Sequence, residues 1–141
     1  IGIVATIIAL TLLAMLGFKG CVKSIYKAQS CEWANIDNIE LHAKIDVPPV
    51  VNTACNYSDS LQLKMAFFEL KKKAFDANKY VALHGFERLS SFDDLGTFSF
   101  NNFKTDTLSL ENLFVKQVAQ HSISVLDAKN KMLWVRVDYK N

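Results

Sequence analysis

The sequence predicts a mainly β protein: a small antiparallel β-sandwich with one short helix, preceded by an N-terminal hydrophobic helix. Three observations lead to this fold class. Residues 1–18 are apolar and uncharged, two later stretches alternate apolar and polar side chains, and residues 121–139 have the pattern of a β-hairpin. About 120 residues follow the apolar segment, which is enough for one domain with one core and too few for two.

The N-terminal segment indicates the compartment. Residues 1–18 contain no Asp, Glu, Lys or Arg. As a helix, a stretch of this length rises about 27 Å, close to the thickness of a bilayer's hydrocarbon core. The stretch also fits the apolar part of an export signal. We therefore divide the chain into a membrane anchor or export signal (1–20), a tether (21–38) and an extracytoplasmic β-rich domain (39–141), located in the cell envelope.

The clearest alternation of apolar and polar residues covers residues 39–47. A period of two predicts a first strand with one apolar face. Pro48 and Pro49 end it, because proline cannot donate a hydrogen bond to a neighbouring strand. Residues 50–60 then predict an exposed loop. Its turn-forming residues are Asn52, Asn56, Ser58 and Asp59.

A second alternation begins at Leu61 and predicts a second strand. The residues that share its apolar face are Leu61, Leu63, Met65 and Phe67. The pattern loses phase at Phe68, which predicts a bulge or the end of the strand. Residues 69–83 have helical spacing in part and predict a short helix or an irregular crossover.

Four further segments complete the predicted sheets. Residues 97–103 predict a third strand and residues 108–110 indicate a fourth. A hairpin follows, with alternation through residues 121–126, turn formers at 127–130 and a strand rich in β-forming residues at 132–139. Four to six strands with one short helix favour a β-sandwich or an antiparallel α+β domain.

The three cysteines are Cys21, Cys31 and Cys55. Cys21 follows Gly20 at the end of the apolar segment, where bacterial lipoproteins are cut and acylated, although the two preceding residues are unusual for that site. If Cys21 carries lipid, Cys31 and Cys55 remain as a pair for a disulfide. Closing a loop of about 25 residues would contribute roughly 3–4 kcal/mol in the chain-entropy model. The alternative is three free thiols in a reducing compartment.

The sequence has no recognisable catalytic pattern. The five glycines form no phosphate-binding cluster, and no spacing of Cys and His suggests zinc. His84 and the Asp93–Asp94 pair are the residues that acid–base chemistry would use, but adjacent acids before Leu-Gly more often form a turn. A net charge of +2 gives no footprint for nucleic acid. We therefore expect that the protein is not an enzyme and that it has no cofactor, no small-molecule substrate and no nucleic-acid partner.

The order of these elements resembles TssJ, the small outer-membrane lipoprotein of the bacterial type VI secretion system. In that family an acylated cysteine precedes a strand, a loop and a second strand that runs into Leu-Lys; Cys21, residues 39–47, residues 50–60 and residues 61–71 take these places here. The resemblance covers about half of the domain, and the tether before the first strand is unusual for the family. It implies a transthyretin-like, two-sheet sandwich whose loop contacts an inner-membrane partner. The residues then placed at the contact are Asn52, Asn56, Tyr57 and Asp59.

These features predict a membrane-anchored structural or interaction subunit of an envelope assembly, most specifically a secretion-system accessory lipoprotein. Its partners would be other subunits of the complex and the lipid bilayer. The alternative is a pilin-like filament subunit, or a single-pass subunit of a membrane complex, whose N-terminal helix is retained and packs with other subunits. The missing acidic residue near position 5 and the early strand at 39–47 count against a standard pilin.

Overall fold

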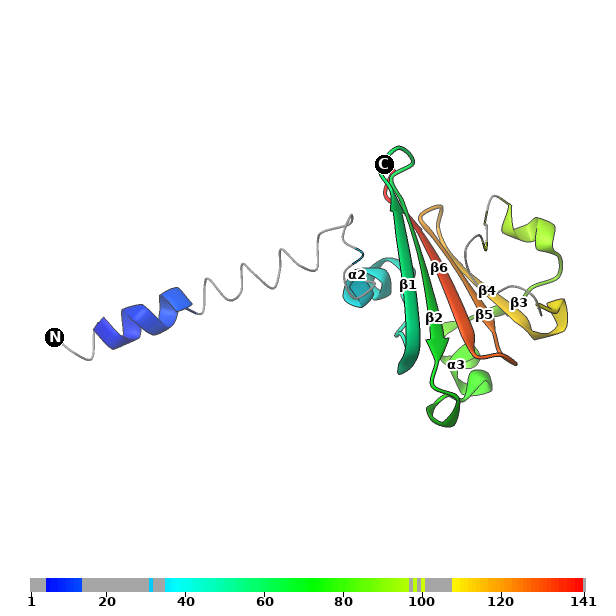
Figure 1. Ribbon diagram of the computed structural model, residues 1–141, viewed down its shortest axis with the longest axis horizontal. Helices are drawn as coiled ribbons and strands as arrows, with labels where there is room; N and C mark the ends of the chain where they lie inside the picture. Colours follow the sequence, from blue (N-terminus) through cyan, green and yellow to red (C-terminus); the bar gives the residue numbers. More distant parts are fainter. Residues whose placement is uncertain are drawn as a thin grey trace.

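The computed structural model describes residues 5–13, 31, 35–96, 98, 100 and 108–140. The strands of this part form a single six-stranded sheet in the order β1-β2-β6-β5-β4-β3, with every pair antiparallel (Figure 1). The strands are β1 (Val50–Ser58), β2 (Leu63–Leu70), β3 (Glu87–Arg88), β4 (Leu113–Val118), β5 (Ser122–Asp127) and β6 (Met132–Asp138). The helices of the domain are α2 (Ile36–Ala43) and α3 (Ala77–His84), with 3-10 turns η2 (Lys72–Ala74), η3 (Phe92–Leu95) and η4 (Leu110–Asn112).

The sheet is covered on both faces, and each face has its own apolar core. On one face, α2 and α3 pack on the sheet through residues such as Ile39 and Tyr80, against Phe68. On the other face, the segment after β3 covers Trp134. The described residues that share this second core are Phe67, Leu89, Leu95, Phe98, Leu113, Ile123, Val125 and Trp134. Helices and loops therefore serve as the outer layers, and the sheet is the middle one.

The mainly β, antiparallel fold is confirmed, whereas the expected second sheet is not found in the described part of the chain. Two of the segments predicted as strands are not observed as strands in that part of the chain. Residues 39–47 form part of a helix and a loop, and most of residues 97–103 lie outside the described residues. Of that segment, Phe98 and Phe100 are described. Their ring centroids lie 5.1 Å apart, and both residues pack on the Trp134 core.

The predicted strand at residues 39–47 is wrong, because the chain forms helix α2 there. Ile39 and Ala43 are fully buried, four residues apart on one helical face, whereas Leu41 is 56% exposed. A strand would have put all three residues on one side. The spacing of apolar residues at 39–43 fits both the helical period of 3.6 and the strand period of two. Packing of α2 on the sheet selects the helix. Pro48 and Pro49 consequently precede a strand and do not end one.

The predicted loop at residues 50–60 is also wrong for most of its length, because Val50–Ser58 is strand β1. It pairs with β2 in continuous register from Asn52 opposite Glu69 to Ser58 opposite Leu63. A strand at the edge of a sheet has one neighbour and few buried positions. Asparagine and serine are therefore tolerated there, and the apolar alternation that marks a strand is absent.

β2 continues through Phe68 without the predicted bulge or strand end and finishes at Leu70. Its apparent loss of phase has a packing cause: Phe67 faces the Trp134 core, and Phe68 faces the core beneath the helices. A strand that is buried on both faces needs apolar residues in both phases. The fourth strand predicted at residues 108–110 is wrong as placed: residue 110 begins η4, and the strand β4 follows at Leu113–Val118.

The predictions nearest to the structure concern the C-terminal hairpin and the short helix. The helix is α3, at the end of the predicted range 69–83, whereas the first part of that range completes β2 and forms η2. The Asp76 side chain accepts a hydrogen bond from the Lys79 amide and caps α3, which ends at Gly85 with φ 67°. Strands β5 and β6 pair from Asp127 opposite Met132 to Ser122 opposite Val137, as the hairpin prediction requires. The buried carboxylate of Asp127 accepts hydrogen bonds from two backbone amides of the connecting turn.

Residues 5–13 near the N-terminus are helical. Five of their large apolar side chains are more than half exposed: Ile7, Ile8, Leu10, Leu12 and Leu13. Among the described residues, no helix is both long and apolar enough to cross a membrane.

Candidate interaction site

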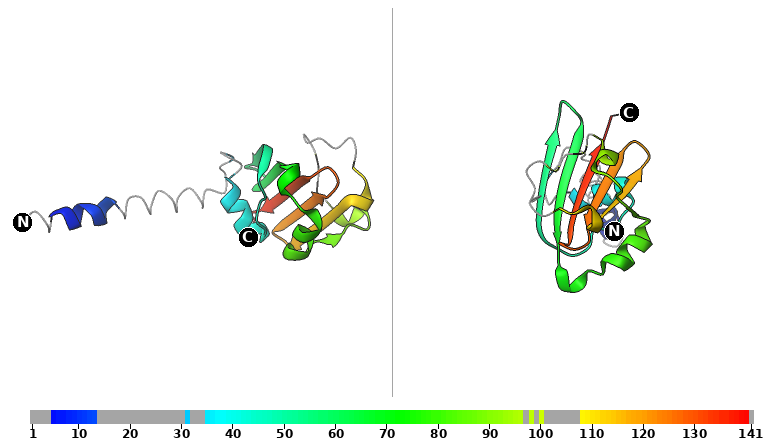
Figure 2. Two further views of the ribbon diagram at one scale, coloured as in Figure 1. Left: turned by 90° about the horizontal axis from the view of Figure 1, so that it is seen from below. Right: turned by 90° about the vertical axis from the view of Figure 1, so that its right-hand side faces the viewer.

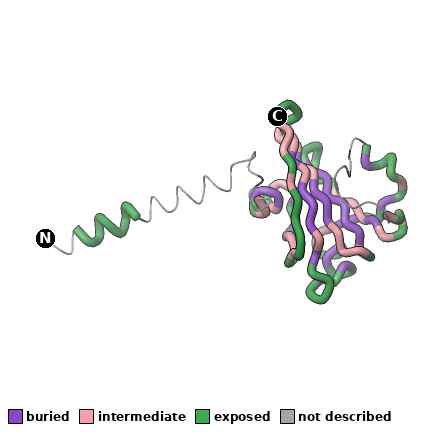
Figure 3. The backbone as a smooth tube through the Cα atoms, viewed as in Figure 1, coloured by how far each residue is buried: buried purple, intermediate pink, exposed green. Residues whose placement is uncertain are grey.

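The candidate site is the free edge of the sheet at β1. Among the described residues, β2 is the one strand that pairs with β1, and β1 lies at the outer border of the sheet in the views of Figures 1 and 2. Figure 3 shows it as a mostly exposed line beside the buried central strands. An edge strand turns the backbone N–H and C=O groups of alternate residues away from its neighbour. β1 therefore offers peptide groups that an added strand can bind.

β1 lacks the side chains with which proteins commonly protect such an edge. Its nine residues include no Asp, Glu, Lys, Arg or Pro, while each of the other five described strands carries at least one charged residue. Charges and prolines on an edge discourage pairing with other chains. One protective feature is present, a register shift between Val50 and Asn52. The regular part of the edge therefore runs from Asn52 to Ser58.

The sequence-predicted contact residues lie along this edge, three of them on strand β1 and one in the turn that follows it. Asn52 and Asn56 are exposed on β1, and Asp59 is exposed in the turn that follows it. Tyr57 is half-buried, and its ring centroid lies 6.2 Å from that of Tyr139. Tyr57 is thus partly committed to the domain, whereas the other three side chains face solvent.

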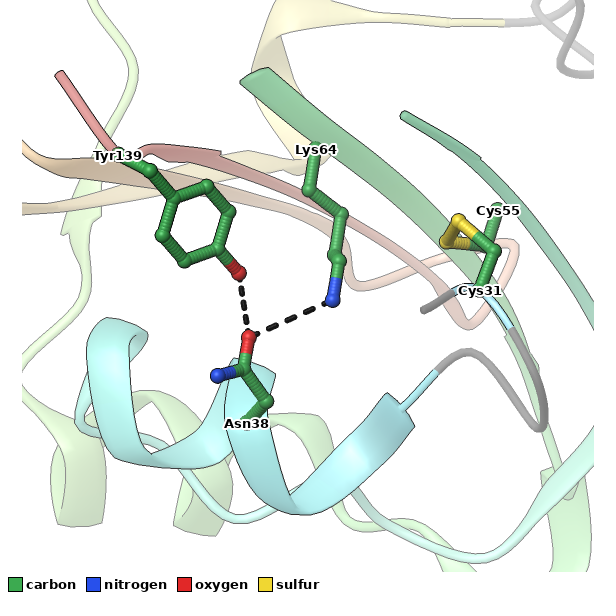
Figure 4. Close-up of a disulfide and its surroundings, with 5 residues drawn as sticks. All are labelled: Cys31, Asn38, Cys55, Lys64 and Tyr139. Atoms are coloured by element: carbon green, nitrogen blue, oxygen red, sulfur yellow. Dashed lines mark hydrogen bonds between the residues drawn. A yellow bond between two sulfur atoms is a disulfide. The ribbon is translucent and has the colours of Figure 1, made fainter. Parts of the chain in front are cut away.

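Cys31 and Cys55 form a disulfide in the structure, with Cα atoms 5.5 Å apart and a sequence separation of 24 (Figure 4). Cys55 lies in β1 and packs against the core beneath the helices. The bond ties the chain before α2 to the edge strand. Cys21, the predicted lipidation site, lies outside the described residues.

A buried polar cluster adjoins this disulfide and was not anticipated from the sequence. Lys64 on β2 is fully buried, and its Nζ donates a hydrogen bond of 3.4 Å to Oδ1 of Asn38 on α2. The hydroxyl of Tyr139 donates to the same oxygen, and Lys64 Nζ lies 5.8 Å from the centre of the Tyr139 ring (Figure 4). The cluster therefore joins α2, β2 and the residue after β6.

Burial determines the electrostatics of this cluster. Loss of hydration disfavours the ammonium form and lowers the pKa of Lys64 from 10.5 to about 8. The same effect, with a smaller contribution from Tyr57, raises the pKa of the Tyr139 hydroxyl well above its usual range. In the sequence, Lys64 occupies the polar phase of an alternating strand, where a solvated side chain is the ordinary expectation. Only the packing of α2 over β2 reveals its burial.

An open groove beside α3 is a second place where titratable residues meet. His84 Nε2 lies 3.8 Å from a carboxylate oxygen of Asp46, and the Tyr80 hydroxyl donates a 2.7 Å hydrogen bond to the Asp46 carbonyl. Burial lowers the pKa of His84, against the opposing effect of Asp46. The groove is lined by Asp46, Pro48, Ala74, Phe75, Asp76, Lys79, Tyr80, Leu83 and His84.

The Asp93–Asp94 pair does not join His84 in this groove. It lies in η3, where the Asp94 carboxylate accepts a 2.9 Å hydrogen bond from the Ser91 amide and completes a capping box. The pair therefore has the turn role that its sequence context favoured. Within the described residues, no group of three or more His, Cys, Asp or Glu is placed to hold a metal ion.

Comparisons with protein-family models, with curated proteins and with solved structures find no match for this chain.

Proposed function

We propose that this chain is a membrane-anchored interaction protein of the cell envelope, and that a partner subunit docks on the β1 edge of its β domain. The observation that carries the proposal is the edge itself. It is nine residues long, uncharged, and exposed at Val51, Asn52, Thr53, Ala54 and Asn56.

Strand addition at such an edge is an established mode of recognition. Main-chain hydrogen bonds supply affinity, and alternate side chains supply specificity. On β1, Asn52, Ala54 and Asn56 share one side of the strand by alternation. The Cys31–Cys55 disulfide and the pairing with β2 hold the edge in extended form before a partner arrives, which lowers the ordering cost of binding.

The anchor is supported by the N-terminal residues. Residues 1–18 are uncharged, and the described helix of residues 5–13 exposes large apolar side chains such as Leu10 and Leu13. Moving such surface from water to a bilayer is favourable by about 25 cal/mol per Å². These exposed apolar side chains support the proposed attachment of the domain to a lipid bilayer.

The most specific form of the proposal is a TssJ-like accessory lipoprotein acylated at Cys21, with a two-sheet, transthyretin-like domain. Two segments used in that resemblance have other structures, since residues 39–43 are helical and Val50–Ser58 is a strand. We therefore base the proposal on the general class, an anchored interaction subunit. The second candidate is a filament or single-pass subunit, which the exposed apolar helix of residues 5–13 also favours.

The first experiment tests the anchor by fractionating native cells. We expect the chain in the membrane pellet after a high-salt wash and in the supernatant after detergent. The double variant Ile8→Lys/Leu12→Lys should leave the membrane, while the matched variant Leu61→Lys/Leu83→Lys, which changes two exposed residues of the β domain, should stay. Measuring the intact mass of the chain distinguishes the lipoprotein from the helix-anchored subunit. A chain that starts at acylated Cys21 supports the lipoprotein, and a chain that retains the apolar segment supports the helix-anchored subunit.

The second experiment tests the edge. A photoreactive amino acid replaces Asn52 in one strain and Lys72, an exposed residue of η2, in another. Irradiation of intact cells should give a discrete cross-linked species at position 52 and none at position 72. A chain that is released by salt and gives the same weak adducts at both positions is not the protein proposed here.

A further inference from the structure

We propose that the occupant of the β1 edge is the β1 edge of a second copy of this chain, paired antiparallel about a two-fold axis at Ala54. The two six-stranded sheets then form one continuous sheet across the dimer. The inference rests on the proposed function, because it names the partner that docks at the edge. It also extends that function, since two anchored chains would form one unit on the membrane.

Charge is the first argument for self-pairing. In a two-fold interface every side chain of the edge meets a side chain of the same edge. A charged residue near the axis would therefore lie close to its own copy, and like charges that face each other across paired strands are destabilising. β1 is the one described strand without a charged residue, while its neighbour β2 carries Lys64 and Glu69. A neutral edge is the kind that can pair with itself.

The register follows from the length of the strand. The alignment that covers all of Val50–Ser58 in both copies places Ala54 opposite itself. Asn52 then faces Asn56 of the second copy, and two amide side chains can each donate and accept a hydrogen bond. Within the regular part of the edge, this alignment pairs even-numbered residues with even-numbered residues and odd-numbered residues with odd-numbered ones. Peptide groups that point outward on one copy therefore meet those that point outward on the other.

The disulfide disfavours the neighbouring alignment, which would centre on Cys55. There the two Cys55 side chains would lie about 5 Å apart on one face, each bonded to a Cys31 and its chain. Centring on Ala54 moves the two disulfides to diagonal positions about 7 Å apart. It also leaves the smallest side chain of the strand at the axis, where the two backbones approach.

One strand per copy makes a small interface beside the roughly 1,200–2,000 Å² of a stable complex. The dimer should therefore depend on concentration in solution. Anchoring both copies to one bilayer raises their effective concentration and confines them to two dimensions. The membrane is accordingly the place where the pairing is expected.

The test uses the full chain in liposomes, in a Cys21→Ser background that removes the cysteine outside the Cys31–Cys55 disulfide. Cysteine is introduced at Ala54, whose side chain lies on the opposite face of the strand from Cys55. The matched control is Leu83→Cys, an exposed position on α3. A short bis-maleimide should convert most of the Ala54→Cys chain to a covalent dimer and little of the Leu83→Cys chain. The proposal is overturned if the two variants cross-link to the same extent, or if neither of them cross-links.

A second measurement needs no new cysteine and remains informative if the cysteine variant folds poorly. Ala54→Lys sets two ammonium groups against each other at the axis, and Leu83→Lys adds the same charge elsewhere. By analytical ultracentrifugation in detergent, the dissociation constant of the dimer should rise about tenfold or more for Ala54→Lys and stay unchanged for Leu83→Lys. Self-pairing is refuted if the wild-type chain is monomeric at every concentration, or if Ala54→Lys leaves the dissociation constant of the dimer unchanged.

The two proposals fail in different ways. If the chain is monomeric but photocross-links from position 52 to another protein, the edge binds a different partner and the proposed function stands. If it neither dimerises nor cross-links from position 52, both proposals are wrong.

Discussion

Replacing Lys64 by methionine should stabilise the folded protein at neutral pH, and the gain should shrink as the pH rises. Lys64 is fully buried, and its Nζ donates a hydrogen bond to Asn38 Oδ1 and lies 5.8 Å from the centre of the Tyr139 ring. Methionine is of similar length and volume, so packing is largely kept. Asn38 Oδ1 still accepts the hydrogen bond from the Tyr139 hydroxyl in the variant. What the variant loses is chiefly a buried charge.

The sign of the pH effect follows from proton binding. Burial lowers the pKa of Lys64 in the folded state to about 8, against 10.5 for the unfolded chain. Between these two values the unfolded state binds more protons than the folded state. The free energy of unfolding therefore rises with pH in this window. Below pH 8 the side chain is charged in both states, and the cost of burying that charge is present in full.

The magnitude follows from the two pKa values. A shift from 10.5 to about 8 corresponds to a cost of about 3 kcal/mol at pH 7. The cost falls to about 1 kcal/mol at pH 10, so that about 2 kcal/mol is recovered between pH 8 and pH 10. Measurements should stop at pH 10, because burial raises the pKa of Tyr80 and Tyr139 above the usual value. Above that pH, ionisation of these tyrosines in the unfolded chain reduces stability.

The assay is urea unfolding followed by circular dichroism at pH 7, 8, 9 and 10, in a Cys21→Ser background that limits thiol exchange. The quantity of interest is the difference between wild type and Lys64→Met, because groups common to both proteins cancel, including the lowered pKa of Lys116. Lys72→Met, at an exposed lysine, is the control and should show no trend. If the difference is constant from pH 8 to pH 10, Lys64 is hydrated or paired in the folded state and the reasoning is refuted.

Three further predictions concern stability and can be checked by urea unfolding. Phe68→Ala removes a fully buried ring and should cost 3–5 kcal/mol, against less than about 1 kcal/mol for Phe92→Ala at a 43% exposed position; similar losses would place Phe68 outside the core. Replacing Cys55 by alanine opens the bond to Cys31 and should cost about 3 kcal/mol under oxidising conditions, whereas wild type in reductant should match the variant. Gly85→Ala should cost about 1 kcal/mol, because φ is 67° and no atom lies within 4 Å of the added methyl group; no loss would mean that the turn after α3 can relax.

The sequence by itself determined the elements whose signals are local. The hairpin of β5 and β6 combines an alternating run, turn residues at 127–130 and a β-rich return strand, and all of these act between residues close in sequence. A short helix is expected in residues 69–83. α3 occupies the end of this range, and its limits are also local, since Asp76 caps it and Gly85 ends it. The mainly antiparallel character of the fold follows from short connections of this kind.

Other elements were decided only by the tertiary structure. Residues 39–43 satisfy the helical and the strand periods alike, and the sheet surface on which Ile39 and Ala43 pack selects the helix. β1 carries no periodic signal because an edge strand buries little, and its extended form comes from pairing with β2. The burial of Lys64 likewise depends on Asn38 and Tyr139, which lie 26 and 75 residues away in sequence. A short sequence pattern reflects only the local conformational preference of its residues. Burial and strand pairing depend on which segments, distant in sequence, come to lie beside it.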